Sequence, residues 1–204
     1  MPNPAYMDNQ RELSWAMCGI LHDWLIQIHL HFHLIPETLL LAINTVDCFL
    51  SVCIVSLAKL QLVGFTCLFI ALKFEEIITL PITQFLNVAK DAYTKNEILQ
   101  AERYVLKTLD WNLSYPNPVH FLCRVSKADG YDIKARTIAK YLVKTMCLEW
   151  RLLSTPPSLL AATAIWLVRL TLDSETWVCI QFCSLLVYLL DHIDTQSSAL
   201  LIIF

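Results

Sequence analysis

The chain has 204 residues, of which 56% are hydrophobic, 11% aromatic and 16% charged, and its formal net charge is −3. This composition excludes a disordered protein, because the apolar residues suffice for one substantial core or two small ones. The small acidic excess gives no electrostatic footprint for nucleic acid or anionic lipid. We therefore expect protein partners, no nucleic acid and no membrane.

Mean hydropathy is +0.53, which raises the question of membrane-spanning segments. Such a span needs about 20 uninterrupted apolar residues. The longest apolar runs contain Gln61, the pair Pro156 and Pro157, or Gln181. We interpret these runs as buried helices and expect no membrane span.

We predict an all-α protein, because glycines are rare and strand-like alternation is confined to the short stretch IHLHFHL. Helix starts are indicated by Pro36 and Asp132. A further start is indicated by Thr94 and Glu97, whose spacing predicts a capping box. The predicted helices cover residues 9–32, 36–51, 57–75, 81–89, 94–109, 117–127, 132–149, 156–171 and 176–192.

The stretch NLSYPNP, residues 112–118, is the predicted joint between two domains, because two prolines interrupt the helical pattern there. The five helices before it and the four helices after it form two similar strings. We therefore predict one domain at residues 1–115 and a second at residues 116–204.

The eight cysteines include no CxxC pair that could chelate zinc, and no secretion signal implies disulfides. We interpret them as reduced, mostly packed thiols of a protein of the nucleus and cytoplasm.

Catalysis finds no support in the sequence. Glu75 and Glu76 are adjacent on a predicted helix, so their carboxylates point about 100° apart and cannot act on one substrate atom. There is no glycine-rich phosphate loop and no Ser, His and Asp constellation. We expect no enzyme activity and no cofactor.

Three histidines, His22, His29 and His33, recur at spacings that place them along one helix face. Such a row could bind a metal, but no carboxylate or cysteine completes a ligand set on that face. We favour partly exposed polar positions on an amphipathic helix and expect no metal site.

Four stretches between residue 4 and about residue 170 carry a distinctive motif spacing: PAYMDNQRELSWAMCGILHDW, KLQLVGFTCLFIALKFEEI, YTKNEILQAERYVLKTLDWNLSYPNPVHFL and SKADGYDIKARTIAKYLVK. They resemble B-type (mitotic) cyclins, in particular fungal ones. The resemblance implies tandem five-helix cyclin boxes that bind and activate a cyclin-dependent kinase. The last thirty or so residues resemble the family only loosely, so we expect the second box to be divergent and incomplete.

The resemblance implies two binding surfaces and two structural residues. The expected kinase interface consists of Lys73, Phe74, Glu102, Leu106 and Trp111. The expected docking patch for Arg-x-Leu segments of substrates or inhibitors consists of Met17, Leu21, Trp24 and Gln61. Structural roles are expected for Asp47 and Leu62.

The chain departs from the family pattern at Cys18 and Cys48, where the pattern has Arg, and at Leu72, where it usually has Ser. In the family's fold the first Arg would pair with the Asp matched by Asp47, so we expect that carboxylate to lack its partner. Each change is reachable by a single C-to-T substitution, which suggests a decaying gene duplicate.

Three functions therefore remain open. The chain is an active kinase-binding cyclin of the G2/M transition, a degenerate cyclin-fold protein that no longer activates a kinase, or a cyclin-fold transcription factor. Charge disfavours the third, because a nucleic-acid-binding face needs an excess of basic residues. The sequence also begins at its first helix, without the basic extension that carries a mitotic cyclin's destruction signal. Either the protein escapes that route of degradation or the sequence is a truncated version of a longer one.

Overall fold

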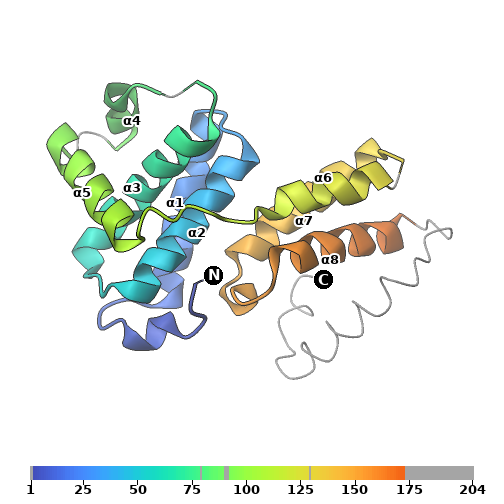
Figure 1. Ribbon diagram of the computed structural model, residues 1–204, viewed down its shortest axis with the longest axis horizontal. Coiled ribbons are helices and arrows are strands. Elements are labelled where there is room, and N and C mark those ends of the chain that lie inside the picture. The colour runs from blue at the N-terminus through green and yellow to red at the C-terminus, as the bar shows by residue number, and fades with distance from the viewer. Residues whose placement is uncertain (1, 79, 90–91, 129, 173–204) are drawn as a thin grey trace. The chain divides into compact units, whose positions relative to one another are not determined.

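The computed structural model describes residues 2–78, 80–89, 92–128 and 130–172, which are helical and contain no strand. Figure 1 shows the order of the elements along the chain. The α-helices are α1 (Trp15–His31), α2 (Pro36–Val52), α3 (Leu57–Glu75), α4 (Ile82–Val88), α5 (Lys95–Thr108), α6 (Pro118–Ala128), α7 (Ile133–Leu148) and α8 (Pro157–Thr171). Two short 3-10 helices accompany them, η1 (Tyr6–Asn9) and η2 (Trp150–Leu152).

The all-α prediction is confirmed, and the helices predicted between residues 36 and 171 agree with these bounds to within one residue. The predicted start of the first helix at residue 9 is wrong. Residues 6–9 form η1, and α1 begins only after Ser14, whose side chain accepts a hydrogen bond from the Met17 amide at 3.5 Å. The helix predicted at residues 176–192 lies outside the described residues.

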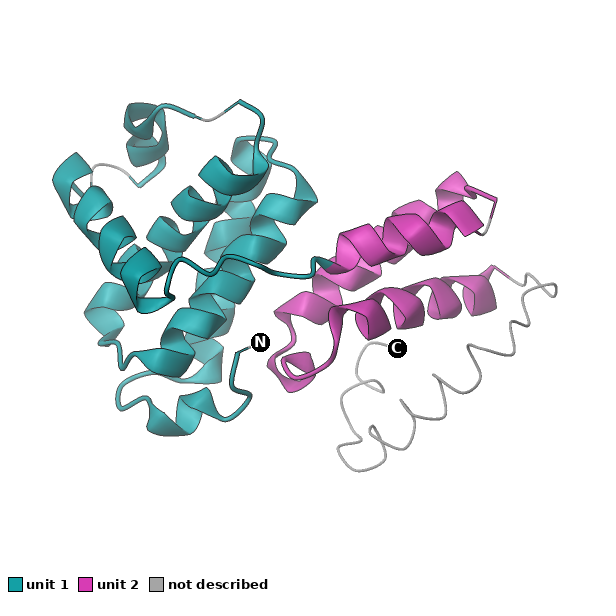
Figure 2. Ribbon diagram, viewed as in Figure 1, with its two compact units in different colours: residues 1–117 teal, residues 118–204 magenta. Residues whose placement is uncertain are grey.

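The chain divides into two compact units, residues 1–117 and residues 118–204 (Figure 2). The domain boundary predicted after residue 115 lies two residues before this division. Asn117, the last residue of the first unit, is buried and its side-chain amide donates to the Glu37 carbonyl at 3.3 Å.

The core of the first unit is built around α3, which packs against α1, α2 and α5. Figure 1 shows α3 running between α2 and α5. Phe65, Leu68 and Leu72 of α3 are fully buried, and Phe85 of α4 stacks on Phe65 with ring centroids 4.2 Å apart. The burial of α3 on several sides explains why its sequence is almost uniformly apolar.

The expectation that no segment could span a membrane needs correction for α3. Among the described residues, this helix alone is long and apolar enough by length and composition. However, 67% of its apolar window is buried within the protein. A core helix satisfies the same criteria, and the packing of α3 accounts for its composition without a bilayer.

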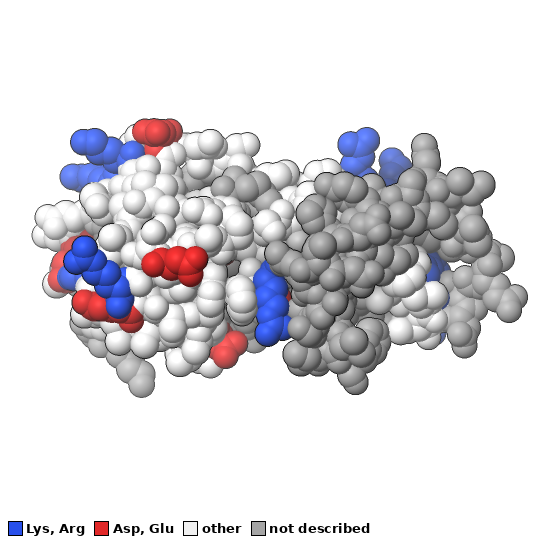
Figure 3. Space-filling model, turned by 90° about the horizontal axis from the view of Figure 1, so that it is seen from below, with Lys and Arg blue, Asp and Glu red and all other residues white. Residues whose placement is uncertain are grey.

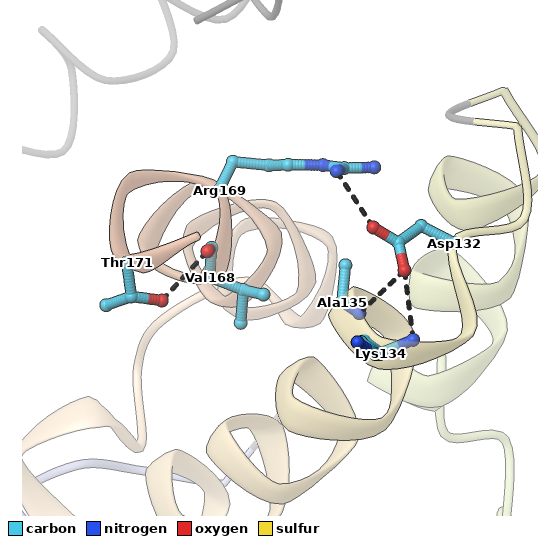
Figure 4. Close-up of polar contacts among 6 residues, drawn as sticks. All are labelled: Asp132, Lys134, Ala135, Val168, Arg169 and Thr171. Atoms are coloured by element: carbon cyan, nitrogen blue, oxygen red, sulfur yellow. Dashed lines mark hydrogen bonds and ion pairs between the residues drawn. The ribbon is translucent and has the colours of Figure 1, made fainter. Parts of the chain in front are cut away.

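In the second unit, α8 packs against both α6 and α7. Asp132 caps α7, because its Oδ1 accepts hydrogen bonds from the Lys134 and Ala135 amides at 3.0 and 3.2 Å. Its other oxygen pairs with Nη1 of Arg169 on α8 at 3.1 Å (Figure 4). The bond from the Ala135 amide, that from Lys134 and the Arg169 guanidinium lower the pKa of the Asp132 carboxyl. One carboxylate thus joins the start of α7 to the end of α8.

Candidate functional site

An ion pair joins α3 and α5 at the position where the resemblance implies a partner-binding surface. Nζ of Lys73 contacts Oε1 of Glu102, and the two side chains are 42% and 8% exposed. The Lys73 ammonium also lies 4.7 Å from the centroid of the Phe69 ring, a cation–π arrangement. The lysine is therefore held in place by two contacts while its outer side remains open to a partner.

Two aromatic side chains of the expected interface are strongly exposed. Phe74, next to Lys73, is 60% exposed and Trp111, just beyond α5, is 69% exposed. The third apolar member, Leu106, is only 8% exposed, so its side chain contributes mainly to the core of the first unit in the free chain. Large exposed aromatic residues beside a few charges are typical of binding hot spots.

A tight turn presents Trp111. Asp110 and Trp111 both adopt left-handed backbone conformations, with φ of 49° and 58°, which cost energy for residues other than glycine. The Trp111 amide donates to the Leu106 carbonyl at 2.8 Å and so closes the end of α5. The turn fixes the backbone from which the indole projects.

Glu76, the second carboxylate of the KFEE stretch, has a structural role. Its Oε1 accepts hydrogen bonds from the Ile35 amide and the Thr38 hydroxyl, each at 2.8 Å. These bonds link the end of α3 to the start of α2.

The members of the expected docking patch differ in exposure. Met17 and Trp24 on α1 are half-buried, Leu21 between them is buried, and Gln61 on α3 is exposed. Their spacing of four and three residues does place the α1 members along one stripe, as expected. The stripe is thus part core and part surface.

The α1 residues of this stripe pack closely against α3. A Cβ at Gly64 would come within 2.7 Å of Leu21 Cδ1, so the absence of a side chain at this position permits the approach. The Trp24 ring packs against Phe65 with centroids 5.7 Å apart. The side-chain oxygen Oε1 of Gln61 accepts a hydrogen bond from the Tyr93 hydroxyl at 3.3 Å. The side-chain NH2 group of Gln61 is thus available as a donor.

Asp47 is buried within the first unit and, among the described residues, has no cationic partner, as expected, but it does have a hydrogen-bond partner that the sequence did not indicate. The Tyr6 hydroxyl donates a hydrogen bond to its Oδ1 at 2.8 Å. Cys18 is also buried, and its Sγ lies 4.0 Å from the same hydroxyl. In the described ranges no lysine or arginine forms a salt bridge with Asp47, and burial raises the pKa of this carboxyl to about 7 although the bond from Tyr6 opposes the shift.

The other departures from the family pattern occupy different environments. Cys48 is half-buried and its Sγ lies 3.7 Å from the Asn44 side-chain oxygen. Leu72 is fully buried in the core, whereas Leu62, expected to be structural, is half-buried on α3. An apolar residue at position 72 suits its surroundings, so that departure has no visible cost.

The histidine row is more buried than the sequence suggests. His22 and His29 are buried, and His33 lies outside α1 in a turn with φ of 52°. The interpretation as partly exposed positions on one helix is wrong for His22 and His29 because they are buried, and for His33, which is exposed, because it lies outside the helix. Burial lowers the pKa of His22 to about 4, so this imidazole is neutral.

The surface offers no dominant charged patch on the face drawn in Figure 3, where lysines and arginines lie in small separate groups among uncharged residues. Within the described part of the chain, no group of three or more histidine, cysteine or acidic side chains could hold a metal ion.

Comparison with known proteins gives matches over most of the chain. Residues 1–114 match the family described as Cyclin, N-terminal domain, and residues 116–200 match Cyclin, C-terminal domain. The chain is 54% identical over 177 residues to the G2/mitotic-specific cyclin cdc13 of Schizosaccharomyces pombe and 50% identical over 177 residues to the G2/mitotic-specific cyclin-B of Emericella nidulans. These matches cover 87% of this chain but 37% of each relative, so the chain spans little more than a third of their length.

Solved structures show the same fold at lower sequence identity. A viral cyclin from herpesvirus saimiri superimposes with a TM-score of 0.75 at 19% identity, covering 82% of this chain and 75% of that chain. A chain of the yeast RNA Pol II CTD kinase CTDK-1 complex superimposes with a TM-score of 0.59 at 12% identity, covering 80% and 57%.

Proposed function

The chain belongs to the cyclin family, and from that premise we propose that it is a regulatory subunit that binds and activates a cyclin-dependent kinase in G2/M control. The chain itself is not the enzyme. The observation that carries the proposal is the ion pair of Lys73 and Glu102, and Lys73 is followed in the sequence by the exposed Phe74.

Glu102 is already shielded, whereas Lys73 keeps an open side. A partner that covers the lysine would exclude water from a charge whose counter-ion is fixed, which strengthens hydrogen bonds from the ammonium to partner carbonyl groups. Phe74 and Trp111 supply apolar area for the same contact.

The test is binding of a purified mitotic cyclin-dependent kinase to a Lys73→Ala, Glu102→Ala double variant. We expect loss of kinase association and activation with the helical far-UV signal retained. The matched control is the double variant Glu149→Ala, Arg151→Ala, which removes the ion pair of 3.7 Å in the second unit. Kinase binding by the first double variant at the level of the unaltered chain would contradict the site assignment.

We also propose that Met17, Leu21, Trp24 and Gln61 form a docking patch for Arg-x-Leu segments of substrates or inhibitors. The half-buried Met17 and Trp24 offer an apolar floor, and the free amide group of Gln61 offers a donor to a peptide carbonyl. We further propose that the protein occurs in both nucleus and cytoplasm, and the distribution of a fluorescent fusion tests this.

A second candidate is a cyclin-fold protein that no longer activates a kinase. The observation that favours it is the buried Asp47, which lies beside Cys18 where the family pattern has Arg. The kinase experiment separates the two candidates, because a degenerate chain would bind the kinase without stimulating phosphorylation or would not bind it at all.

A further inference from the structure

The start of α2 lacks a capping side chain of its own. Its N-cap residue is Ile35, whose side chain makes no capping hydrogen bond, and Pro36 follows without an amide hydrogen. The missing acceptor comes from a distant part of the sequence. Oε1 of Glu76 accepts from the Ile35 amide and from the hydroxyl of the fully buried Thr38, each at 2.8 Å.

The same Glu76 ends α3. Its amide donates to the Leu72 carbonyl at 3.1 Å, and its backbone then leaves the helix in an extended conformation. Its carboxylate also places negative charge at the positive end of α2, which is the favourable orientation. One residue thus terminates one core helix and caps another.

The last turn of α3 carries Lys73 and Phe74, both of the proposed kinase-binding surface. The final carbonyls of a helix lack internal partners, so a last turn opens more easily than the helix centre. Ile77 and Ile78, which follow Glu76, are almost fully exposed and make no comparable anchor. The two hydrogen bonds of Glu76 therefore attach the end of this turn to the start of α2, in addition to the burial of Leu72 and the contact of Lys73 with Glu102.

We propose that Glu76 is a positioning residue of the kinase-binding surface, which holds Lys73 and Phe74 in place by tying the last turn of α3 to the start of α2. This inference rests on the function proposed above. It assigns to the second carboxylate of the KFEE stretch a role that requires no contact with the partner.

The experiment compares Glu76→Ala, Glu76→Gln and Thr38→Val by amide hydrogen exchange and by affinity for a purified mitotic cyclin-dependent kinase. For Glu76→Ala we expect faster exchange confined to residues 70–76 and the start of α2, with at least tenfold weaker kinase binding. Glu76→Gln keeps an oxygen that accepts both bonds, so its affinity should stay within about threefold of the original. Thr38→Val removes one bond and should be intermediate.

The matched control is Gln10→Ala at the opposite ends of the same two helices. The Gln10 side chain donates to the Leu50 and Cys53 carbonyls at 2.9 and 2.7 Å and accepts from the Val55 amide at 3.0 Å. Its loss should lower the melting temperature while kinase affinity of the folded protein stays within twofold.

Two results would overturn the proposal. One is unchanged exchange at residues 70–76 in Glu76→Ala, and the other is an equal loss of affinity in Gln10→Ala. If Glu76→Ala does not fold, Thr38→Val decides by the same two measurements. If the unaltered chain binds no kinase, the proposed function fails, and the exchange comparison alone then decides whether Glu76 positions the turn.

Discussion

Tyr6 and Asp47 form a buried hydrogen bond of 2.8 Å between the segment before α1 and the middle of α2. Both side chains are almost completely shielded from water, and the carboxyl has no cation beside it among the described residues. One hydroxyl cannot replace the solvation of a full negative charge, so the carboxyl holds its proton more tightly than in water. The buried carboxyl of Asp47 is therefore an electrostatically unfavourable site of the first unit.

Replacing Cys18 by Arg should stabilise the first unit, because the guanidinium would lie beside Tyr6 and Asp47 and could compensate the buried carboxylate. We expect the melting temperature to rise by several degrees, equivalent to about 1–2 kcal/mol. Cys18→Met is the control, since it adds volume without charge. A melting temperature that does not rise in Cys18→Arg would mean that the Tyr6 hydroxyl is a sufficient partner.

Stability should rise on mild acidification from pH 8 and then level off near pH 6.5. The folded pKa of Asp47 is raised from 3.8 to about 7, so the folded state takes up a proton in this range while the unfolded state does not. The expected gain is about 1 kcal/mol. Below pH 6.5 the unfolded chain protonates His22, whose folded pKa is lowered from 6.5 to about 4, and this opposes any further gain.

Urea unfolding followed by circular dichroism at several pH values checks both contributions. Asp47→Asn should abolish the gain between pH 8 and 6.5. His22→Val should let stability continue to rise down to about pH 5, because only the Asp47 contribution then remains. A stability that is flat from pH 8 to pH 6 in the unaltered chain would show that Asp47 titrates normally.

Lys73→Ala should destabilise the free chain more than Glu102→Ala does. Removal of the lysine leaves a buried carboxylate without its counter-ion, whereas removal of the glutamate leaves a lysine that can reach water. We expect a difference of about 1–3 kcal/mol in the free energy of unfolding. Equal losses, measured by thermal melts of both variants, would mean that Glu102 gains access to solvent once Lys73 is absent.

Trp24→Ala should weaken binding of a labelled Arg-x-Leu peptide at least tenfold while kinase affinity changes less than twofold. The indole forms part of the proposed docking patch but packs on Phe65 from its other side. Gln61→Ala, at an exposed position, should reduce peptide binding without changing the melting temperature. If Trp24→Ala unfolds and Gln61→Ala binds peptide normally, Trp24 is a core residue and the patch assignment is wrong.

Most helix bounds could be predicted because local signals fix them. Asp132 caps α7 as expected, and the reciprocal hydrogen bonds of Thr94 and Glu97 form the predicted capping box. The sequence predicts too early a start for α1, because the residues before Ser14 also carry helix-compatible side chains. In the structure the Gln10 side chain instead binds the turn between α2 and α3.

Long-range pairs could not be predicted from local patterns. Tyr6 lies 41 residues from Asp47, and Glu76 lies 38 residues from Thr38, so neither spacing reflects a helical or strand period. The spacing of His22 and His29 identifies a shared face of α1 but not that the face is buried. Family resemblance indicates Lys73 and Glu102 as members of the kinase interface. Only the structure shows that the Lys73 side chain is partly exposed and the Glu102 side chain is shielded from water.

Gly64 is a buried residue beneath the proposed docking patch, so a change there would act on the patch without altering its surface residues. Because Leu21 occupies the space where a side chain at position 64 would lie, the depth of the patch is set by a single missing methyl group. Enlarging residue 64 would raise Leu21 toward the surface and make the floor shallower, which favours smaller apolar side chains in the ligand. If the patch binds peptides as proposed, its selectivity is adjustable from inside the protein, with every contact residue left unchanged.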